Sequence, residues 1–191
     1  MPLSPHPPPA LARKKLPIIR FNGPLFRIHR TEDNPLHFGR RMLHRFDSPD
    51  GKYGVLYAGE DLFCAFIETL GHEPGRDLVE MRDLEIRSVA TLEGKRGLRL
   101  VDFCGSGLAK VGADARLCVG DYHLAQQWSQ ALHDDTERPD GIRYPSRRDP
   151  SRISVALFHR CRSAIRVTNS IELAWHPDLS TVLGHYGFGL A

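Results

Sequence analysis

Two arginines, a tyrosine, a glutamate and a serine are the residues of this chain best suited to chemistry: Arg27, Arg45, Tyr57, Glu68 and Ser146. The guanidinium group of arginine is a planar fork of N–H donors, which matches the oxygens of phosphate and pyrophosphate. A carboxylate, a phenol and a hydroxyl supply hydrogen-bonding partners for a sugar. Together the five side chains fit a ligand that contains a pyrophosphate and a sugar.

The common motifs of metal, nucleotide and hydrolase sites are missing from the sequence. The ten histidines form neither an HxxxH nor an HExxH pattern, and no histidine and cysteine cluster has the spacing of zinc ligands, so we expect no metal site. Gly105-Ser106-Gly107 is not a Gly-x-Ser-x-Gly elbow, and no third glycine follows it to complete a dinucleotide fingerprint. Cys104 ends an apolar run, where packing is favoured over a nucleophilic role.

The segment 54–71 must position both the tyrosine and the glutamate. Apolar residues alternate up to Tyr57, which predicts a strand that ends near this residue. The apolar residues that follow recur at three- and four-residue steps, the period of a helix: Leu62, Ala65, Phe66 and Thr69. Asp61 stands where acidic groups favour a helix start. Glu68 borders the apolar stripe, so we expect its carboxylate to be partly desolvated or aimed into a cleft.

The two arginines are expected on different kinds of element. A turn signal at Asn22-Gly23-Pro24 and the alternation after it predict a strand, in which Arg27 points away from the phenylalanine and isoleucine beside it. Arg27 then faces a cavity or solvent, and a plain surface arginine on an edge strand is the alternative. Arg45 lies in segment 31–50, a predicted long loop of the kind that is often functional. Its basic residues suit phosphate, and a solvated basic loop is the alternative.

The folded part is predicted to be one α+β domain, with a mixed or antiparallel sheet and short flanking helices. Further strands are expected at residues 82–91, 98–103, 154–158 and 165–169, and helices at residues 121–132 and 179–186. Strands outnumber helices and do not alternate strictly with them. The proline-rich residues 1–15 are predicted to be a disordered tail, which leaves residues 16–191 as the domain.

Composition and charge exclude several classes of protein. The 191 residues are 41% hydrophobic, enough for one sizeable core but not for two. The net charge of +3 arises from 26 basic and 23 acidic residues, so no general field favours nucleic acid. No stretch approaches the roughly 20 apolar residues of a membrane span, and no signal peptide is recognisable. The four scattered cysteines suit reduced thiols, so we expect a soluble cytoplasmic protein.

The chain resembles the RES domain family, which takes its name from an arginine, a glutamate and a serine. The resemblance covers roughly residues 24–160. It rests on the order of Phe26-Arg27, Arg45-Phe46, the run Val55-Leu56-Tyr57 before the helix of Glu68, and the late Ser146 in Gly-Ile-Arg-Tyr-Pro-Ser-Arg. Many members carry Gly-Gly-Arg-Trp-Asn in the loop, whereas this chain has Leu43-His-Arg45-Phe-Asp47.

The resemblance implies a fold, an activity and partners. RES proteins are toxins of bacterial type II toxin–antitoxin pairs, resemble ADP-ribosyltransferase toxins in fold, and deplete NAD by cleavage or phosphorolysis of its nicotinamide glycosidic bond. By resemblance, residues 16–191 are a catalytic domain with NAD as substrate, inorganic phosphate as an optional co-substrate and no cofactor. An Xre-like antitoxin is the implied partner, a homodimer is allowed for, and nucleic acid is expected only through the antitoxin.

The resemblance also implies a role for each residue of the opening set. It puts Arg27 and Arg45 on the NAD phosphates, Tyr57 against the nicotinamide or its ribose, Glu68 at the reacting ribose and Ser146 in the pocket lining. Two other functions stay open at this point. An ADP-ribosyltransferase would pass ADP-ribose to a protein or nucleotide, and a non-catalytic module would bind nucleic acid or a partner through the basic loop and Arg147-Arg148.

Overall fold

The computed structural model describes residues 6–8, 11, 14–71 and 77–191. The strands within these ranges are β1 (Ile18–Phe21), β2 (Leu25–Arg30), β3 (Val55–Gly59), β4 (Leu78–Val79), β5 (Arg87–Gly94), β6 (Leu98–Asp102), β7 (Gly141–Pro145), β8 (Ile153–Phe158), β9 (Ile165–Glu172) and β10 (Gly189–Leu190). The α-helices are α1 (Leu62–Leu70), α2 (Met81–Glu85), α3 (Gly107–Val111), α4 (Arg116–Val119), α5 (Tyr122–His133) and α6 (Leu179–Tyr186). Two short 3-10 helices, η2 (His159–Ala164) and η3 (Leu173–Trp175), flank β9.

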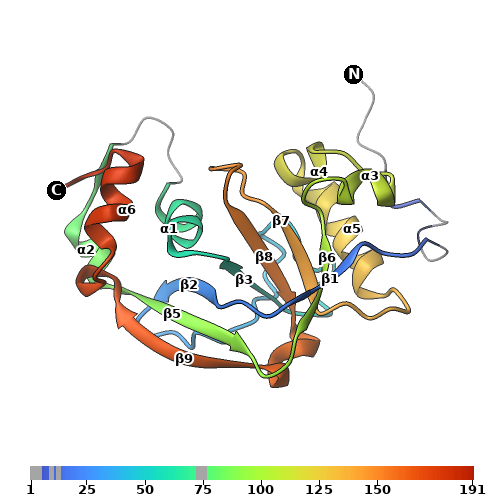
Figure 1. Ribbon diagram of the computed structural model, residues 1–191, viewed down its shortest axis with the longest axis horizontal. Helices are drawn as coiled ribbons and strands as arrows, with labels where there is room; N and C mark the ends of the chain where they lie inside the picture. Colours follow the sequence, from blue (N-terminus) through green and yellow to red (C-terminus); the bar gives the residue numbers. More distant parts are fainter. Residues whose placement is uncertain (1–5, 9–10, 12–13, 72–76) are drawn as a thin grey trace.

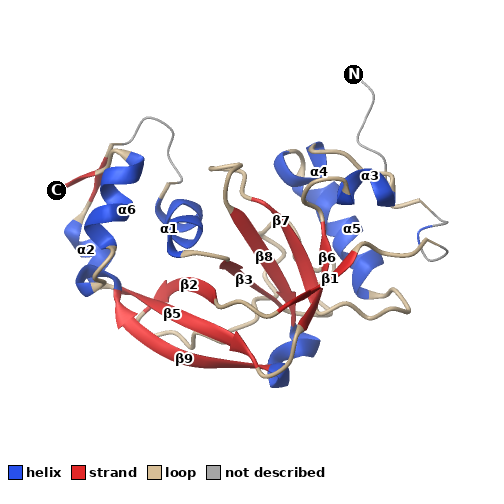
Figure 2. Cartoon of the chain, viewed as in Figure 1, coloured by secondary structure: helices blue, strands red, loops and turns tan. Residues whose placement is uncertain are grey.

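One large curved sheet organises the described part of the chain. Its eight strands follow the order β1-β6-β7-β8-β3-β2-β5-β9, and β10 and β4 form a small second sheet. Every neighbouring pair in the large sheet is antiparallel except β6 and β7. Figure 1 shows α1, α2 and α6 gathered at one end of the sheet and α3, α4 and α5 at the other. The predicted α+β class with a mixed sheet and short helices is confirmed (Figure 2).

The large sheet nearly splits between β2 and β3. These two strands share a single register pair, Phe26 opposite Gly59, because the chain leaves β3 at Gly59 and turns directly into α1. A Cβ atom at Gly59 would lie 2.7 Å from the Cβ atom of Cys64, so the turn requires glycine. The two halves of the sheet therefore diverge beside α1, and the strand and helix predicted for segment 54–71 meet at this point.

The helices cover different portions of the hydrophobic core, and a third portion spans both halves of the sheet. Trp128 and Leu132 of α5 are fully buried against β6, β7 and β8. Asp121 caps α5, because its side chain accepts a hydrogen bond from the backbone N–H of His123. On the other half, Phe66 of α1 packs with residues of β2, β5 and α6. Each helix thus fixes one wall of the space between the two halves.

Two predictions about local structure are changed or left open. The strand predicted at residues 82–91 is wrong in its first part, because Met81–Glu85 form α2 and β5 begins at Arg87. Leu84 is buried against α6 and η3, so tertiary packing overrides the apparent alternation. Most of the tail predicted to be disordered lies outside the described residues, although Leu11 is buried in the core beside α5. No helix in the described ranges is long and apolar enough to cross a membrane.

Candidate active site

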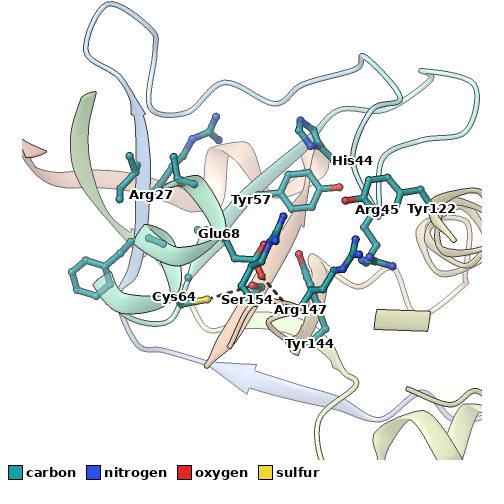
Figure 3. Close-up of a pocket in the computed structure, with 17 residues that line it drawn as sticks. Arg27, His44, Arg45, Tyr57, Cys64, Glu68, Tyr122, Tyr144, Arg147 and Ser154 are labelled. Atoms are coloured by element: carbon teal, nitrogen blue, oxygen red, sulfur yellow. Dashed lines mark hydrogen bonds between the residues drawn. The ribbon is translucent and has the colours of Figure 1, made fainter. Parts of the chain in front are cut away.

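A cavity of about 320 Å³ opens where the two halves of the sheet diverge. This volume lies at the lower end of the range of small-molecule sites. Its walls come from β2, the end of β3, α1, the start of α5, one residue each of β7 and β8, and two loops (Figure 3). The polar and aromatic lining residues are Arg27, His44, Arg45, Tyr57, Cys64, Glu68, Tyr122, Tyr144, Arg147, Arg148 and Ser154. Four of the five residues singled out in the sequence therefore lie on one cavity.

Helix α1 brings Glu68 to the cavity. Asp61 caps the helix, because its Oδ1 atom accepts a hydrogen bond from the backbone N–H of Cys64 at 2.7 Å. The buried face of α1 contains Ala65 and Phe66. Glu68 lies one turn further along at the edge of this face, and it is half-buried as the sequence predicts.

The two carboxylate oxygens of Glu68 have different surroundings. Oε1 accepts a hydrogen bond from Ser146 Oγ at 2.5 Å and another from the backbone N–H of Arg147 at 3.0 Å. Ser146 Oγ in turn accepts from the N–H groups of Arg148 and Asp149, so its own proton is directed to Glu68. Within the described residues Oε2 has no hydrogen-bond partner, and it is left for a ligand.

Ser146 differs from the prediction that it lines the pocket. The side chain is only 1% exposed and is not among the lining residues. Its three hydrogen bonds tie the turn after β7 to Glu68, 78 positions earlier in the chain. Ser146 therefore orients the carboxylate instead of meeting a ligand in the cavity.

Arg45 is almost fully buried, yet one of its nitrogen atoms is unused. The residue is 6% exposed, and its Nη1 atom donates to the carbonyl groups of Leu117 and Gly120 at 3.3 and 2.9 Å. Its guanidinium carbon lies 4.7 Å from the ring centre of Tyr122, which favours the cation. Nη2 is buried without a hydrogen-bond partner in the described structure. A buried donor of this kind calls for a partner, and an anionic oxygen in the cavity would supply one.

Tyr57 directs its hydroxyl group away from the cavity and its ring toward it. The hydroxyl donates to Asp47 Oδ1 at 3.0 Å and accepts from the backbone N–H of Phe46 at 2.9 Å. Burial and the neighbouring Asp47 carboxylate hold the pKa of the phenol well above its usual value. The phenol is therefore neither a base nor a free donor, and the ring remains as the surface for a ligand.

Arg27 stands across the cavity from Arg45 (Figure 3). It is half-buried on β2, and its Nη1 atom donates to the carbonyl group of His37 at 3.0 Å. Burial lowers the pKa of Arg27 to about 10, although the nearby Asp33 carboxylate raises it. The side chain is thus charged at neutral pH, and Tyr57 and Glu68 lie between two cations (Figure 3).

The loop that carries Arg45 is held in place by α5. Gln126 Nε2 donates to the carbonyl groups of Met42 and His44, each at 3.1 Å, and Ser129 Oγ donates to that of Phe46 at 2.6 Å. Met42 adopts a positive φ of 59°, which is uncommon for a residue with a side chain and marks local strain. Many members of the RES domain family have two glycines at this point of the loop. This chain lacks them, and the hydrogen bonds from α5 keep the loop in its conformation.

Several residues that line the cavity are not identified from the sequence as part of this site. Arg147 and Arg148, assigned there to a nucleic-acid alternative, lie on the cavity, and Tyr122 forms the rim beside Arg45. The lining contains four arginines against the single carboxylate of Glu68, so the cavity favours an anionic ligand. These residues come from turns and a helix end without periodicity, which only the fold brings together.

Nucleophilic chemistry by cysteine receives little support from this geometry. Burial raises the pKa of the Cys64 thiol to about 12, and burial does the same for Cys104, which lies away from the cavity. Both thiols are protonated at neutral pH and are poor nucleophiles. Among the described residues, no group of three or more histidine, cysteine, aspartate and glutamate side chains is arranged to hold a metal ion.

Comparison with known proteins gives a consistent family signal. The model of the RES domain family matches residues 24–176. The "Probable toxin y4kH" of Sinorhizobium fredii (strain NBRC 101917 / NGR234) is 32% identical over 94 residues, which cover 48% of this chain and 72% of that protein. A chain in the crystal structure of the M. tuberculosis MbcT–MbcA toxin–antitoxin complex superposes with a TM-score of 0.65. It shares 14% identity and the match covers 89% of this chain and 91% of that chain, so this likeness concerns the fold.

Proposed function

The chain belongs to the RES domain family, and on this basis we propose that it is the toxin of a toxin–antitoxin pair that cleaves the nicotinamide–ribose bond of NAD. Support for the role as a toxin comes from the 32% identical relative, which is named a probable toxin. The proposed partner is an Xre-like antitoxin, and the solved complex of the structural neighbour is consistent with a protein partner. Because the proposed substrate is NAD, the proposed toxin would act in the cytoplasm.

The main support for the proposed reaction is a carboxylate oxygen without a hydrogen-bond partner in the described structure, on a cavity lined by guanidinium groups. Glu68 Oε2 has no partner among the described residues, and Arg45 Nη2 is a buried donor without an acceptor. A dinucleotide supplies a partner for each of these atoms. Its pyrophosphate accepts hydrogen bonds from arginine, and its ribose develops a positive charge during bond cleavage that a carboxylate stabilises. Arg27 supplies a second cation for the pyrophosphate from the opposite side.

The proposed mechanism needs only one carboxylate. As the bond between ribose C1′ and the pyridinium nitrogen breaks, its electron pair passes to the nitrogen and neutral nicotinamide leaves. Glu68 stabilises the oxocarbenium-like sugar or holds its 2′-hydroxyl, an electrostatic contribution of roughly 2.7–4 kcal/mol. Nicotinamide is a good leaving group, so no general acid is required. Water then bonds to C1′ and passes one proton to the solvent, or an anionic oxygen of inorganic phosphate bonds to C1′ without any proton loss.

The ring of Tyr57 is proposed to stack on the pyridinium ring of NAD. Because its hydroxyl hydrogen bonds go to Asp47 and Phe46, Tyr57→Phe should keep the stacking surface and lower NAD turnover less than about tenfold. Tyr57→Ala should be slower than Tyr57→Phe by a further factor of about 2 to 30, the value of a cation–π contact. Steady-state rates of the two variants measure the difference. Equal losses would assign the function to the hydroxyl group instead.

The proposed activity is tested by incubating the purified chain with NAD, with and without phosphate, and identifying the products. Nicotinamide with ADP-ribose indicates hydrolysis, and nicotinamide with an ADP-ribose phosphate that forms only when phosphate is added indicates phosphorolysis. Label found on an added protein or nucleotide would instead make the chain an ADP-ribosyltransferase. Absence of nicotinamide release, combined with salt-sensitive binding of RNA or DNA, would replace the enzyme by a binding module.

A further inference from the structure

Asp47 is a buried carboxylate at the base of the loop that carries Arg45. It is 2% exposed. Its Oδ2 atom accepts hydrogen bonds from the backbone N–H groups of Leu43 and His44, both at 3.0 Å. Its Oδ1 atom accepts the proton of the Tyr57 hydroxyl at 3.0 Å. One side chain is therefore bonded both to the loop and to β3.

Hydrogen bonds to Asp47 and Tyr57 fix the backbone before and after Arg45. The hydroxyl of Tyr57 also accepts from the backbone N–H of Phe46, the residue that follows Arg45. Asp47 bonds to the two N–H groups that precede Arg45 in the chain. The backbone on both sides of Arg45 is thus fixed to the same pair of side chains, and the guanidinium group reaches the carbonyl groups of Leu117 and Gly120 at the end of α4, beside the cavity.

We propose that Asp47 is the positioning residue of this site, holding the guanidinium of Arg45 and the ring of Tyr57 in the arrangement in which both face the cavity. The proposal rests on the proposed function for its kinetic consequence, because that function gives Arg45 and Tyr57 their ligand. Its structural consequence is independent of any ligand. Without the carboxylate, the backbone N–H groups of Leu43 and His44 lose their acceptor.

The negative charge of Asp47 has a further effect on Tyr57. A carboxylate can only accept, so the phenol must donate its proton to Asp47 and keeps none for the cavity. An asparagine at this position would use its oxygen for the two backbone N–H groups and its NH₂ group for the phenol oxygen. The phenol proton would then have to find another acceptor. Asp47 therefore makes the ring of Tyr57, and not its hydroxyl, the surface that a ligand meets.

The ligand-free test is hydrogen–deuterium exchange of the peptide that covers residues 42–47. We expect Asp47→Ala to accelerate exchange in this peptide at least about tenfold, since a hydrogen bond to a charged acceptor is lost at each of two amides. Asp47→Asn should leave the peptide protected. The matched control is Asp50→Ala, because Asp50 is an exposed loop carboxylate that bonds only to Ser48 and Lys52 in the described structure.

The kinetic test uses the same variants with NAD. Asp47→Ala should raise KM about 10- to 100-fold and change kcat less, because phosphate contacts bind substrate and transition state alike. Asp50→Ala should stay near the wild-type KM, and Asp47→Asn should raise KM less than Asp47→Ala does, because the amide oxygen still accepts from the loop. In a chain that already carries Arg45→Ala, adding Asp47→Ala should raise KM by a smaller factor than it does in the wild-type chain, since coupled residues are not additive.

Three results would overturn the positioning role. One is exchange in the 42–47 peptide of Asp47→Ala that equals that of Asp50→Ala. Another is faster exchange that extends equally to the peptide of β8, which would make Asp47 a general stability residue. The third is a full additional loss when Asp47→Ala is combined with Arg45→Ala. If the wild-type chain does not consume NAD, the proposed function fails, while the exchange experiment still decides the role of Asp47.

Discussion

Glu68→Gln is expected to lower NAD turnover about 10²- to 10³-fold, the cost of removing one oriented electrostatic contact from a transition state. Glutamine keeps the size of the side chain, and its carbonyl oxygen can still accept from Ser146 Oγ and the Arg147 N–H group. Its NH₂ group would take the place of Oε2 and face the cavity as a donor. The substitution thus removes the negative charge that opposes the growing positive charge of the ribose.

The experiment compares purified Glu68→Gln with wild type for nicotinamide release and for thermal unfolding. We expect the Tm to change by less than about 4 °C, which corresponds to roughly 1 kcal/mol for a chain of this size. Glu93→Gln is the matched control, because Glu93 is a carboxylate of β5 that pairs with Arg166 outside the cavity lining. Undiminished turnover in folded Glu68→Gln would eliminate the proposed mechanism.

Arg27→Ala is expected to lower kcat/KM for NAD about 10- to 100-fold, which matches the roughly 1.5–3 kcal/mol of a hydrogen bond to a charged group. The guanidinium bonds to only one protein acceptor, the carbonyl group of His37, within the described residues. The remaining donors are free for a pyrophosphate. Arg30→Ala is the matched control, because Arg30 lies on the same strand but is exposed and outside the cavity lining.

The pH dependence separates Arg27 from the groups that titrate near neutrality. Burial lowers the pKa of this arginine to about 10, so its charge is constant through the neutral range and contributes no titration step there. The fold loss of kcat/KM in Arg27→Ala should therefore be the same at about pH 6 and about pH 8. A loss that differs between these two values would show that the substitution acts through another group that titrates.

The local elements of the site could be predicted from the sequence because each is encoded by short-range periodicity. Alternation up to Tyr57 and the three- and four-residue steps after it give β3 and α1, and they fix Glu68 at the edge of the buried face. The alternation of β2 predicts Arg27 on the face opposite Phe26 and Ile28, whereas burial does not alternate along the strand and all three residues line the cavity. The resemblance to the RES domain family, carried by the order of these residues, is confirmed by the family match.

The prediction of α2 shows where this kind of reasoning fails. Apolar residues alternate weakly in residues 82–86, which favours a strand, yet Met81–Glu85 form a helix. An ion pair between Asp83 and Arg87, four residues apart, and the burial of Leu84 against α6 stabilise the helical form. Packing partners that lie about a hundred residues away in the chain decide between two conformations of similar local preference.

The sequence by itself pointed to four residues that line the cavity, and the tertiary structure decided how they are held. Ser146 was expected in the cavity wall, but long-range contact places it behind Glu68, where it orients Oε1 and leaves Oε2 open. Arg45 was assigned to a loop of uncertain geometry, and Gln126 and Asp47 fix that loop. The hydrogen bonds of Gln126 and Ser146 join residues some 80 positions apart in the chain. No local pattern encodes such a pairing, because it forms only after the two halves of the sheet and α5 have packed.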